Sequence, residues 1–196
     1  MEKNVRWPTC QLLSWATLVV LPFLFAPTPA YAEGFVSPFA GIVFGNQPVE
    51  GDVAVGVSAG HMAAGAIGFE LDLGYEPDIF GESIDNYAVT VMGNLIIGIP
   101  VGGTSGAGVR PYVTGGIGLI RTDFGGLLDS EGPTTNDLGF NLGGGVMAIF
   151  SDHFGVRGDL RYLRNLTSDF KDADLDPEIA LGNLDFWRAT VGIVIR

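Results

Sequence analysis

The sequence has little cysteine, little charge and, beyond its N-terminal region, no long apolar stretch. Its single cysteine, Cys10, excludes an intramolecular disulfide and a cysteine-rich metal site. Charged residues make up 16% of the chain, below the usual quarter, whereas hydrophobic residues make up 47%. After residue 32, no run approaches the roughly 18 apolar residues that indicate a membrane-spanning helix. The composition therefore indicates a surface covered by something other than water, but not a helical membrane protein.

The first 32 residues have the pattern of a secretory signal peptide. Two basic residues precede an apolar run at residues 12–25, and small residues follow that end in Ala30-Tyr31-Ala32. The run is shorter than the roughly 20 residues that a helix needs to span a bilayer. We therefore expect residues 1–32 to be a cleaved signal peptide and residues 33–196 to form one mature domain. Cys10 would leave with the signal, so we expect no lipid attachment.

Acidic residues outnumber basic residues throughout the chain. The sequence contains 22 Asp and Glu against 10 Lys and Arg, which gives a formal charge of −12. Residues 33–196 alone carry 21 acidic and 8 basic residues, which gives −13. Because nucleic acids bind proteins that neutralise their phosphates, this balance argues against a nucleic-acid partner.

Apolar residues recur at every second position after residue 32, which is the period of a β-strand. The clearest case is residues 67–75. One face carries Ile67, Phe69, Leu71, Leu73 and Tyr75, and the other carries Gly68, Glu70, Asp72 and Gly74. Closed barrels are the other structure that satisfies every backbone amide in a membrane, and 30 glycines suit the narrow lumen of a small barrel. The pattern predicts strands with an apolar outer face and a polar inner face.

The same alternation predicts eight strands, an even number that is typical of bacterial barrels. They lie at residues 35–44, 53–61, 65–75, 85–99, 109–121, 137–150, 154–165 and 185–195. Short or glycine-rich links are expected at 61–64, 100–108 and 151–153, and longer polar loops at 45–52, 76–84, 122–136 and 166–184. The sequence therefore predicts an all-β, eight-stranded, antiparallel up-and-down transmembrane β-barrel, with tight turns and both termini on the periplasmic side.

Several segments resemble the family of small outer-membrane β-barrels that includes the transmembrane domain of OmpA, OmpX and the opacity proteins. They are the strand at 35–44, "IGFELDLGY" from Ile67, "RPYVTGGIGLI" from Arg110, "LGFNLGGGVMAIF" from Leu138 and "VRGDLRYL" from Val156. The resemblance covers nearly all of residues 33–196. One departure is the ending Ile195-Arg196, where family members usually end in an aromatic residue.

The resemblance implies where the protein resides and what it meets. We expect it in the cell outer membrane, in contact with outer-membrane lipid and lipopolysaccharide, and assembled by the barrel-assembly machinery. A host or surface ligand could bind its extracellular loops.

The charges that the alternation places in the lumen balance in number. They are Glu70, Asp72 and Asp159 against Arg157, Arg161 and Arg188. Our hypothesis is that these six residues form a buried ion-pair network that plugs the interior, because unpaired charges there would be costly. The alternative is a gate, in which an exchange of partners opens a narrow pore.

Aromatic residues near the predicted strand ends suggest two girdles at the membrane boundaries. The predicted outer girdle comprises Phe44, Tyr75, Tyr87, Phe140 and Trp187, and the inner girdle comprises Phe35, Tyr112, Phe150 and Phe154. The alternative interpretation is ordinary core packing in a soluble barrel.

Candidate metal and catalytic motifs fail on their details. The acidic run at residues 169–178 has alternating carboxylates, but Pro177 stands where a calcium loop requires glycine. Ser151-Asp152-His153 contains the residue types of a catalytic triad, but adjacent residues cannot adopt its geometry. His61 is predicted in a periplasmic turn, away from the outer leaflet. We therefore predict no catalytic, metal or cofactor site.

These observations favour a non-enzymatic surface barrel with a structural or adhesive role, because binding residues usually lie on loops held by a rigid scaffold. Three alternatives remain open: a narrow gated pore, a lipid-modifying outer-membrane enzyme and a soluble periplasmic barrel that binds an apolar ligand.

Overall fold

The computed structural model of the chain describes residues 32–45, 49, 53–81, 86–102, 107–124, 134–166 and 184–196. The predicted signal peptide lies outside the described residues except for Ala32, where the first strand begins. The acidic run at 169–178 also lies outside them. In the part of the chain that is described, no helix has the length and apolarity needed to cross a membrane.

Eight strands, and no helix among the described residues, make up the fold. They are β1 (Ala32–Gly45), β2 (Val53–Ala63), β3 (Ile67–Pro77), β4 (Tyr87–Gly98), β5 (Gly108–Asp123), β6 (Thr134–Ile149), β7 (Phe154–Asn165) and β8 (Asp185–Ile195). Each predicted strand is present, so the predicted fold class is confirmed. The lengths of 11 to 16 residues suit tilted membrane-spanning strands.

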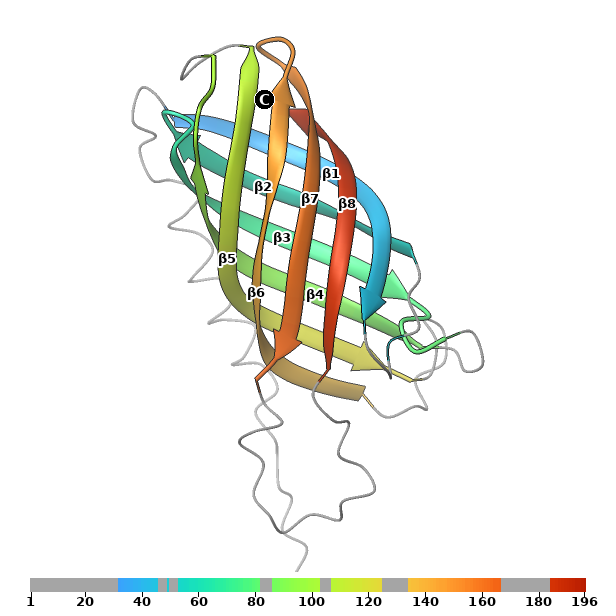
Figure 1. Cartoon of the computed structure of the whole chain (residues 1–196). Coiled ribbons are helices and arrows are strands. Elements are labelled where there is room, and N and C mark those ends of the chain that lie inside the picture. The colour runs from blue at the N-terminus through green and yellow to red at the C-terminus, as the bar shows by residue number, and fades with distance from the viewer. Residues whose placement is uncertain are drawn as a thin grey trace, which may run out of the picture. The chain divides into compact units, whose positions relative to one another are not determined.

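The strands form one closed barrel in which each strand pairs with its neighbours in sequence (Figure 1). All pairs are antiparallel, and β1 closes the barrel against β8, with Val36 opposite Ile195 and Phe44 opposite Trp187. Closure removes both sheet edges, so every strand has hydrogen-bonding partners on both sides. The barrel therefore meets the condition for crossing a membrane with strands.

The two ends of the barrel differ in their connections. The turn end, uppermost in Figure 1, carries residues 32 and 196 and the links 64–66, 99–107 and 150–153. The loop end carries the links 46–52, 78–86, 124–133 and 166–184, of which 124–133 and 166–184 are longer than any link at the turn end. This alternation is the one predicted from the sequence. The β2–β3 link is the tightest, since Ala64 and Gly65 both adopt a positive φ and Ala66 N donates to Ala63 O at 3.0 Å.

Two boundaries differ from the prediction in an informative way. Strands β5 and β6 continue to Asp123 and Thr134, into residues predicted to be loop. The two residues face each other in the ladder, and the Thr134 hydroxyl donates to the Asp123 carboxylate at 2.7 Å. Polar residues at a strand end satisfy each other here, so polarity alone gave the wrong boundary.

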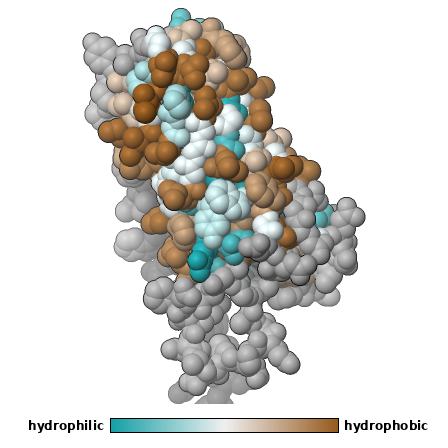
Figure 2. All heavy atoms as spheres, viewed as in Figure 1, coloured by the Kyte–Doolittle hydropathy of each residue, from teal (hydrophilic) through white to brown (hydrophobic). Residues whose placement is uncertain are grey.

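Large apolar side chains are exposed over the outer wall, and Figure 2 shows them as brown patches between less hydrophobic residues on the face in view. On β3, Ile67, Phe69 and Leu71 are about half exposed, whereas Glu70 and Asp72 on the other face are almost completely buried. The alternation places the apolar side chains toward lipid and the polar ones toward the lumen. The wall and the lumen thus arise from alternate residues of the same strands.

Candidate functional site in the barrel lumen

The six residues predicted to line the lumen all point inward and are buried. They come from β3, β7 and β8, and none is more than 9% exposed. β3 and β7 are not neighbours in the barrel, so the contacts between them run across the lumen. The structure brings all six together in one set of ion pairs.

Arg161 lies at the centre of this set. Its Nη2 lies 2.7 Å from Glu70 Oε1, and its Nε lies 2.6 Å from Asp159 Oδ1. Its Nη1 lies 3.5 Å from Asp72 Oδ2. One guanidinium therefore joins three carboxylates from two strands, which fixes the separation of β3 and β7.

Arg157 occupies the side of the set nearer the turn end. It pairs with Glu70, and its Nη2 lies 2.8 Å from Asp159 Oδ2. Its Nε donates to the Tyr112 hydroxyl at 2.6 Å, and that hydroxyl donates to Asp159. The Arg157 guanidinium also lies 4.9 Å from the centre of the Tyr112 ring, a cation–π distance.

Arg188 occupies the side nearer the loop end. It pairs with Asp72, and its Nη1 lies 2.9 Å from Glu76 Oε1 and donates to the Thr90 hydroxyl at 3.1 Å. The Phe39 ring lies under the guanidinium, with 5.0 Å between Cζ and the ring centre. Glu76 thus joins the set as a seventh member, and we call these seven residues the lumen network.

Sequence reasoning missed Glu76 because it was assigned to a loop. β3 continues to Pro77, so the alternation that turns Glu70, Asp72 and Gly74 inward also turns Glu76 inward. Extending the period by two residues would have found it. Neutral polar side chains complete the shell: Asn94 donates to Glu70 at 3.1 Å and Ser58 donates to Asp72 at 2.9 Å.

Two inward glycines make room for the network. A Cβ on Gly74 would lie 2.1 Å from Arg188 Nη1 and 2.5 Å from Glu76 Oε1. A Cβ on Gly143 would lie 2.9 Å from the Arg161 side chain. Since real Cβ atoms do not approach so closely, the glycines of these strands let the long arginine side chains lie across the lumen.

Apolar residues close the lumen on both sides of the network. The loop-end apolar cluster comprises Val43, Val49, Ala54, Ile79, Ala88, Met92, Ile120, Leu163, Leu184 and Phe186. The turn-end apolar cluster comprises Phe35, Met62, Ile96, Tyr112, Met147, Ile149 and Val194. The lumen therefore has a polar middle between two apolar layers.

The β3–β4 connection contributes to the loop-end closure. Ile79 is completely buried, and the Phe80 ring stacks on Phe124 with 5.1 Å between ring centres. Asn86 holds this connection in place, because its side chain accepts from Phe80 N at 3.0 Å and donates to Gly81 O at 2.9 Å. Ile79 and Phe80 thus add to the apolar packing at the loop end of the lumen.

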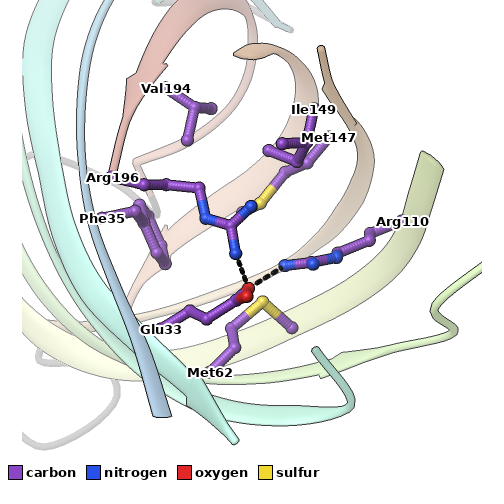
Figure 3. A pocket seen from close by; sticks show the side chains of 8 residues that line it. All are labelled: Glu33, Phe35, Met62, Arg110, Met147, Ile149, Val194 and Arg196. Carbon is purple, nitrogen blue, oxygen red and sulfur yellow. Dashed lines mark hydrogen bonds and ion pairs between the residues drawn. The ribbon is translucent and has the colours of Figure 1, made fainter. Parts of the chain in front are cut away.

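A second group of charges lies at the turn end, where two guanidiniums converge on one carboxylate (Figure 3). Arg110 Nη1 lies 2.7 Å from Glu33 Oε2, and Arg196 pairs with the same oxygen. We call these three residues the turn-end ion cluster. They line a small pocket together with Met62, Met147 and other members of the turn-end apolar cluster. The ion cluster links β1, β5 and the residue after β8.

The predicted aromatic girdles are partly correct. At the loop end, Tyr75 lies beside Tyr87 and Tyr162 beside Trp187, with 5.7 and 5.3 Å between ring centres. Phe44 and Trp187 are about 40% exposed on the outer wall. At the turn end, Phe150 and Phe154 also point outward, with 67% and 57% exposed.

Two members of the predicted inner girdle are wrong. Phe35 and Tyr112 are about 95% buried inside the lumen, because their positions fall on the inward phase of β1 and β5. Proximity to a strand end does not decide direction, whereas the phase of the alternation does. Tyr112 instead joins the polar middle of the lumen to the turn-end apolar cluster.

The remaining candidate motifs are not brought into a chemical site. Ser151, Asp152 and His153 are exposed, and Ser151 Oγ accepts from Phe154 N at 3.2 Å, which stabilises the turn. His61 lies within β2 rather than in a turn, stacked on Phe69. Among the described residues, no group of three or more His, Cys, Asp or Glu is arranged to hold a metal ion.

Comparisons with known proteins agree with this architecture. The sequence profile of the outer membrane protein beta-barrel domain matches residues 16–192. The neisserial surface protein A (NspA) structure aligns with a TM-score of 0.64 at 15% identity, over 84% of this chain and 97% of that one. The N-terminal barrel of Pseudomonas aeruginosa OprF aligns with a TM-score of 0.54 at 18% identity, over 84% and 96%. A comparison with curated protein sequences finds no match.

Proposed function

This chain belongs to the outer membrane protein β-barrel family, and from that premise we propose that it is a non-enzymatic surface barrel with a closed lumen. The protein is an outer-membrane protein with an eight-stranded barrel. In this proposal the barrel is a rigid anchor, and the links at its loop end carry a structural or adhesive function.

The observation that carries the proposal is the filling of the lumen. Four carboxylates and three guanidiniums occupy the middle, and an apolar cluster lies on either side of them. Ions would have to pass both apolar layers and displace buried ion pairs, which is costly. A barrel with this interior suits anchoring better than conduction.

The direction of the barrel follows from the family. Outer-membrane barrels have short periplasmic turns and longer extracellular loops. We therefore assign the turn end to the periplasm and the loop end to the cell exterior. The name of the neisserial neighbour, surface protein A, is consistent with a role that faces outward.

The outer wall indicates the partners that we propose. Its apolar band suits outer-membrane lipid, and the aromatic residues at the loop end suit the boundary with lipopolysaccharide. The barrel-assembly machinery would insert the chain, and a host or surface ligand would bind the loop-end links.

A non-enzymatic role is supported by the placement of the candidate catalytic residues. His61 faces outward within β2, near the turn end, and His153 lies in an exposed turn at that same end. An enzyme acting on outer-leaflet lipid would need a base near the loop end. In the described residues, no histidine lies there.

Protease treatment of whole cells tests the direction of the barrel. We expect cleavage within residues 124–133 or 166–184, and cleavage at the turn end only after the cells are permeabilised. Fragments cut at residues 99–107 in intact cells would contradict the assignment.

Planar-bilayer recording tests the closed lumen. We expect the protein purified from outer membranes to give no discrete conductance steps. Regular steps at a constant amplitude would instead support the gated pore.

Loop replacement tests the adhesive role. Residues 125–133 and residues 167–183 would each be replaced by a short turn, and binding of cells that display each variant to host cells or matrix would be measured. We expect one replacement to abolish binding while the barrel still migrates as a folded species on unheated gels. Unchanged binding in both variants, or no binding by the parent protein, would overturn an adhesive role.

A further inference from the structure

The lumen network contains one more carboxylate than guanidinium. Glu70, Asp72, Glu76 and Asp159 face three arginines, and all seven side chains are at most 4% exposed. The sequence alone predicted three of each sign. The addition of Glu76 therefore leaves a buried group with a formal charge of −1.

The contacts show where the imbalance is located. Glu70, Asp72 and Asp159 each pair with two arginines. Glu76 pairs with Arg188 alone, through Oε1 at 2.9 Å, and Arg188 also pairs with Asp72. Glu76 Oε2 is completely buried and has no hydrogen-bond partner among the described residues. Glu76 is thus the carboxylate with the weakest compensation.

The groups that face Glu76 come from three strands. Arg188 from β8 and the Thr90 hydroxyl from β4 both approach Oε1, the latter at 3.4 Å, and Asp72 lies two residues earlier on β3. Residues of the loop-end apolar cluster lie on the loop-end side of Glu76. One of them, Ile79, comes three residues after Glu76 in the chain. Asp72 adds negative charge, so the surroundings do not supply the missing cation.

The other lumen arginines are also committed elsewhere. Arg161 lies among Glu70, Asp72 and Asp159, and Arg157 lies between Glu70 and Asp159. Arg110 and Arg196 lie at the turn end with Glu33. In the described lumen, the positive charge nearest to Glu76 is therefore the one that it shares with Asp72.

We infer that Glu76 is a proton-binding site and that it is occupied at neutral pH. A buried charge without a full counter-charge is costly, and such a group takes up a proton instead. Oε1 accepts from Arg188 and Thr90, so the proton belongs on Oε2. With that proton bound, the network carries three charges of each sign. The inference does not depend on whether the loops are adhesive.

Infrared spectroscopy tests the proton directly. In protein extracted from outer membranes, we expect the C=O stretch of a protonated carboxylic acid at pH 7, and its loss in Glu76→Gln. The matched control is Glu33→Gln, which removes a carboxylate of the turn-end ion cluster, leaves the charge of the lumen network unchanged and keeps the band. Absence of the band in the parent protein, or its survival in Glu76→Gln, would overturn the inference.

Stability against pH provides the second test. An unfolded glutamate binds protons only near pH 4, so folding takes up a proton at neutral pH, and stability must fall as pH rises toward the point where folded Glu76 ionises. We expect the urea midpoint of the parent to fall as pH is raised above 7, and the midpoint of Glu76→Gln to fall less. At pH 7, Glu76→Gln raises the midpoint, because folding of this variant no longer has to take up a proton, whereas Glu70→Gln lowers it.

Two outcomes of this experiment would overturn the inference. The first is a parent midpoint that is independent of pH, together with a loss in Glu76→Gln as large as that in Glu70→Gln. The second is a midpoint that depends on sodium at fixed pH and loses this dependence in Glu76→Gln, because the site would then hold a metal cation rather than a proton.

Discussion

In the part of the lumen that the structure describes, carboxylates and guanidiniums meet at two places, which differ in burial and in connectivity. In the lumen network every side chain is at most 4% exposed, and Arg161 joins three carboxylates. In the turn-end ion cluster, Glu33 is 22% exposed and one carboxylate serves two arginines. Buried, shared contacts depend on each other, whereas a partly exposed pair competes with water. Ion pairs should therefore contribute much more to the free energy of unfolding in the lumen network than in the turn-end ion cluster.

The largest difference is expected from Arg161→Ala. Removal of this guanidinium leaves Glu70, Asp72 and Asp159 short of a partner, which costs about 3–5 kcal/mol for a buried pair. Urea titration of the folded barrel in detergent measures the loss. Arg121→Ala is the matched control, since that side chain is 51% exposed on the outer wall and should change stability by less than about 0.5 kcal/mol. Equal losses of stability in the two variants would contradict the expected difference between buried and exposed arginines.

Tyr112→Phe tests the residue that lies between the two places. Its hydroxyl is hydrogen-bonded to Asp159 and Arg157, while its ring belongs to the turn-end apolar cluster. Because both hydrogen bonds involve charged groups, we expect the free energy of unfolding to fall by about 1.5–3 kcal/mol in the same titration. Phe154→Leu, on the outer wall, should have a smaller effect. No loss in Tyr112→Phe would mean that the network does not extend to Tyr112.

Gly74→Ala tests whether the network tolerates added volume. The new methyl would overlap Arg188, which its carboxylates hold in place, so we expect a loss of about 1–3 kcal/mol. Gly158→Ala is the control, because a Cβ there meets no atom within 4 Å. If both variants unfold at the same urea concentration, the lumen is looser than the contacts indicate.

The smallest effect is expected from Glu33→Gln. A partly exposed ion pair contributes about 1 kcal/mol or less, and salt screens it. The midpoint should therefore change little, and the difference from the parent should shrink further at high salt. A loss comparable with that of Arg161→Ala would show that the turn-end ion cluster is as important as the lumen network.

The wall of the barrel follows from local sequence. The alternation at residues 67–75 alone tells which side chains face lipid, because a strand turns successive residues to opposite faces. The same alternation places Glu70 and Asp72 of β3 on the inner face, and Arg157 and Arg161 of β7 as well. The prediction failed where a strand boundary was misplaced, as for Glu76, and where proximity to a strand end was used in place of the alternation, as for Tyr112.

The contacts within the lumen could not be predicted in the same way. Glu70 and Arg161 are 91 positions apart in the chain, and Asp72 and Arg188 are 116 apart. Which pairs meet depends on the register of every strand between them, and a shift of one residue would turn the side chains of a strand to the other face. The sequence indicates which residues belong to the network, whereas the register of all the strands between them determines which residues pair.

The seam between β1 and β8 has a consequence for biogenesis. Residues 36–45 of β1 pair with residues 186–195 of β8, so this pairing can form only after the last strand has been synthesised. Pairings this distant in sequence make folding slow. A nascent chain that stops before residue 185 would leave two strand edges without hydrogen-bonding partners, so we expect such truncation products to be degraded rather than inserted.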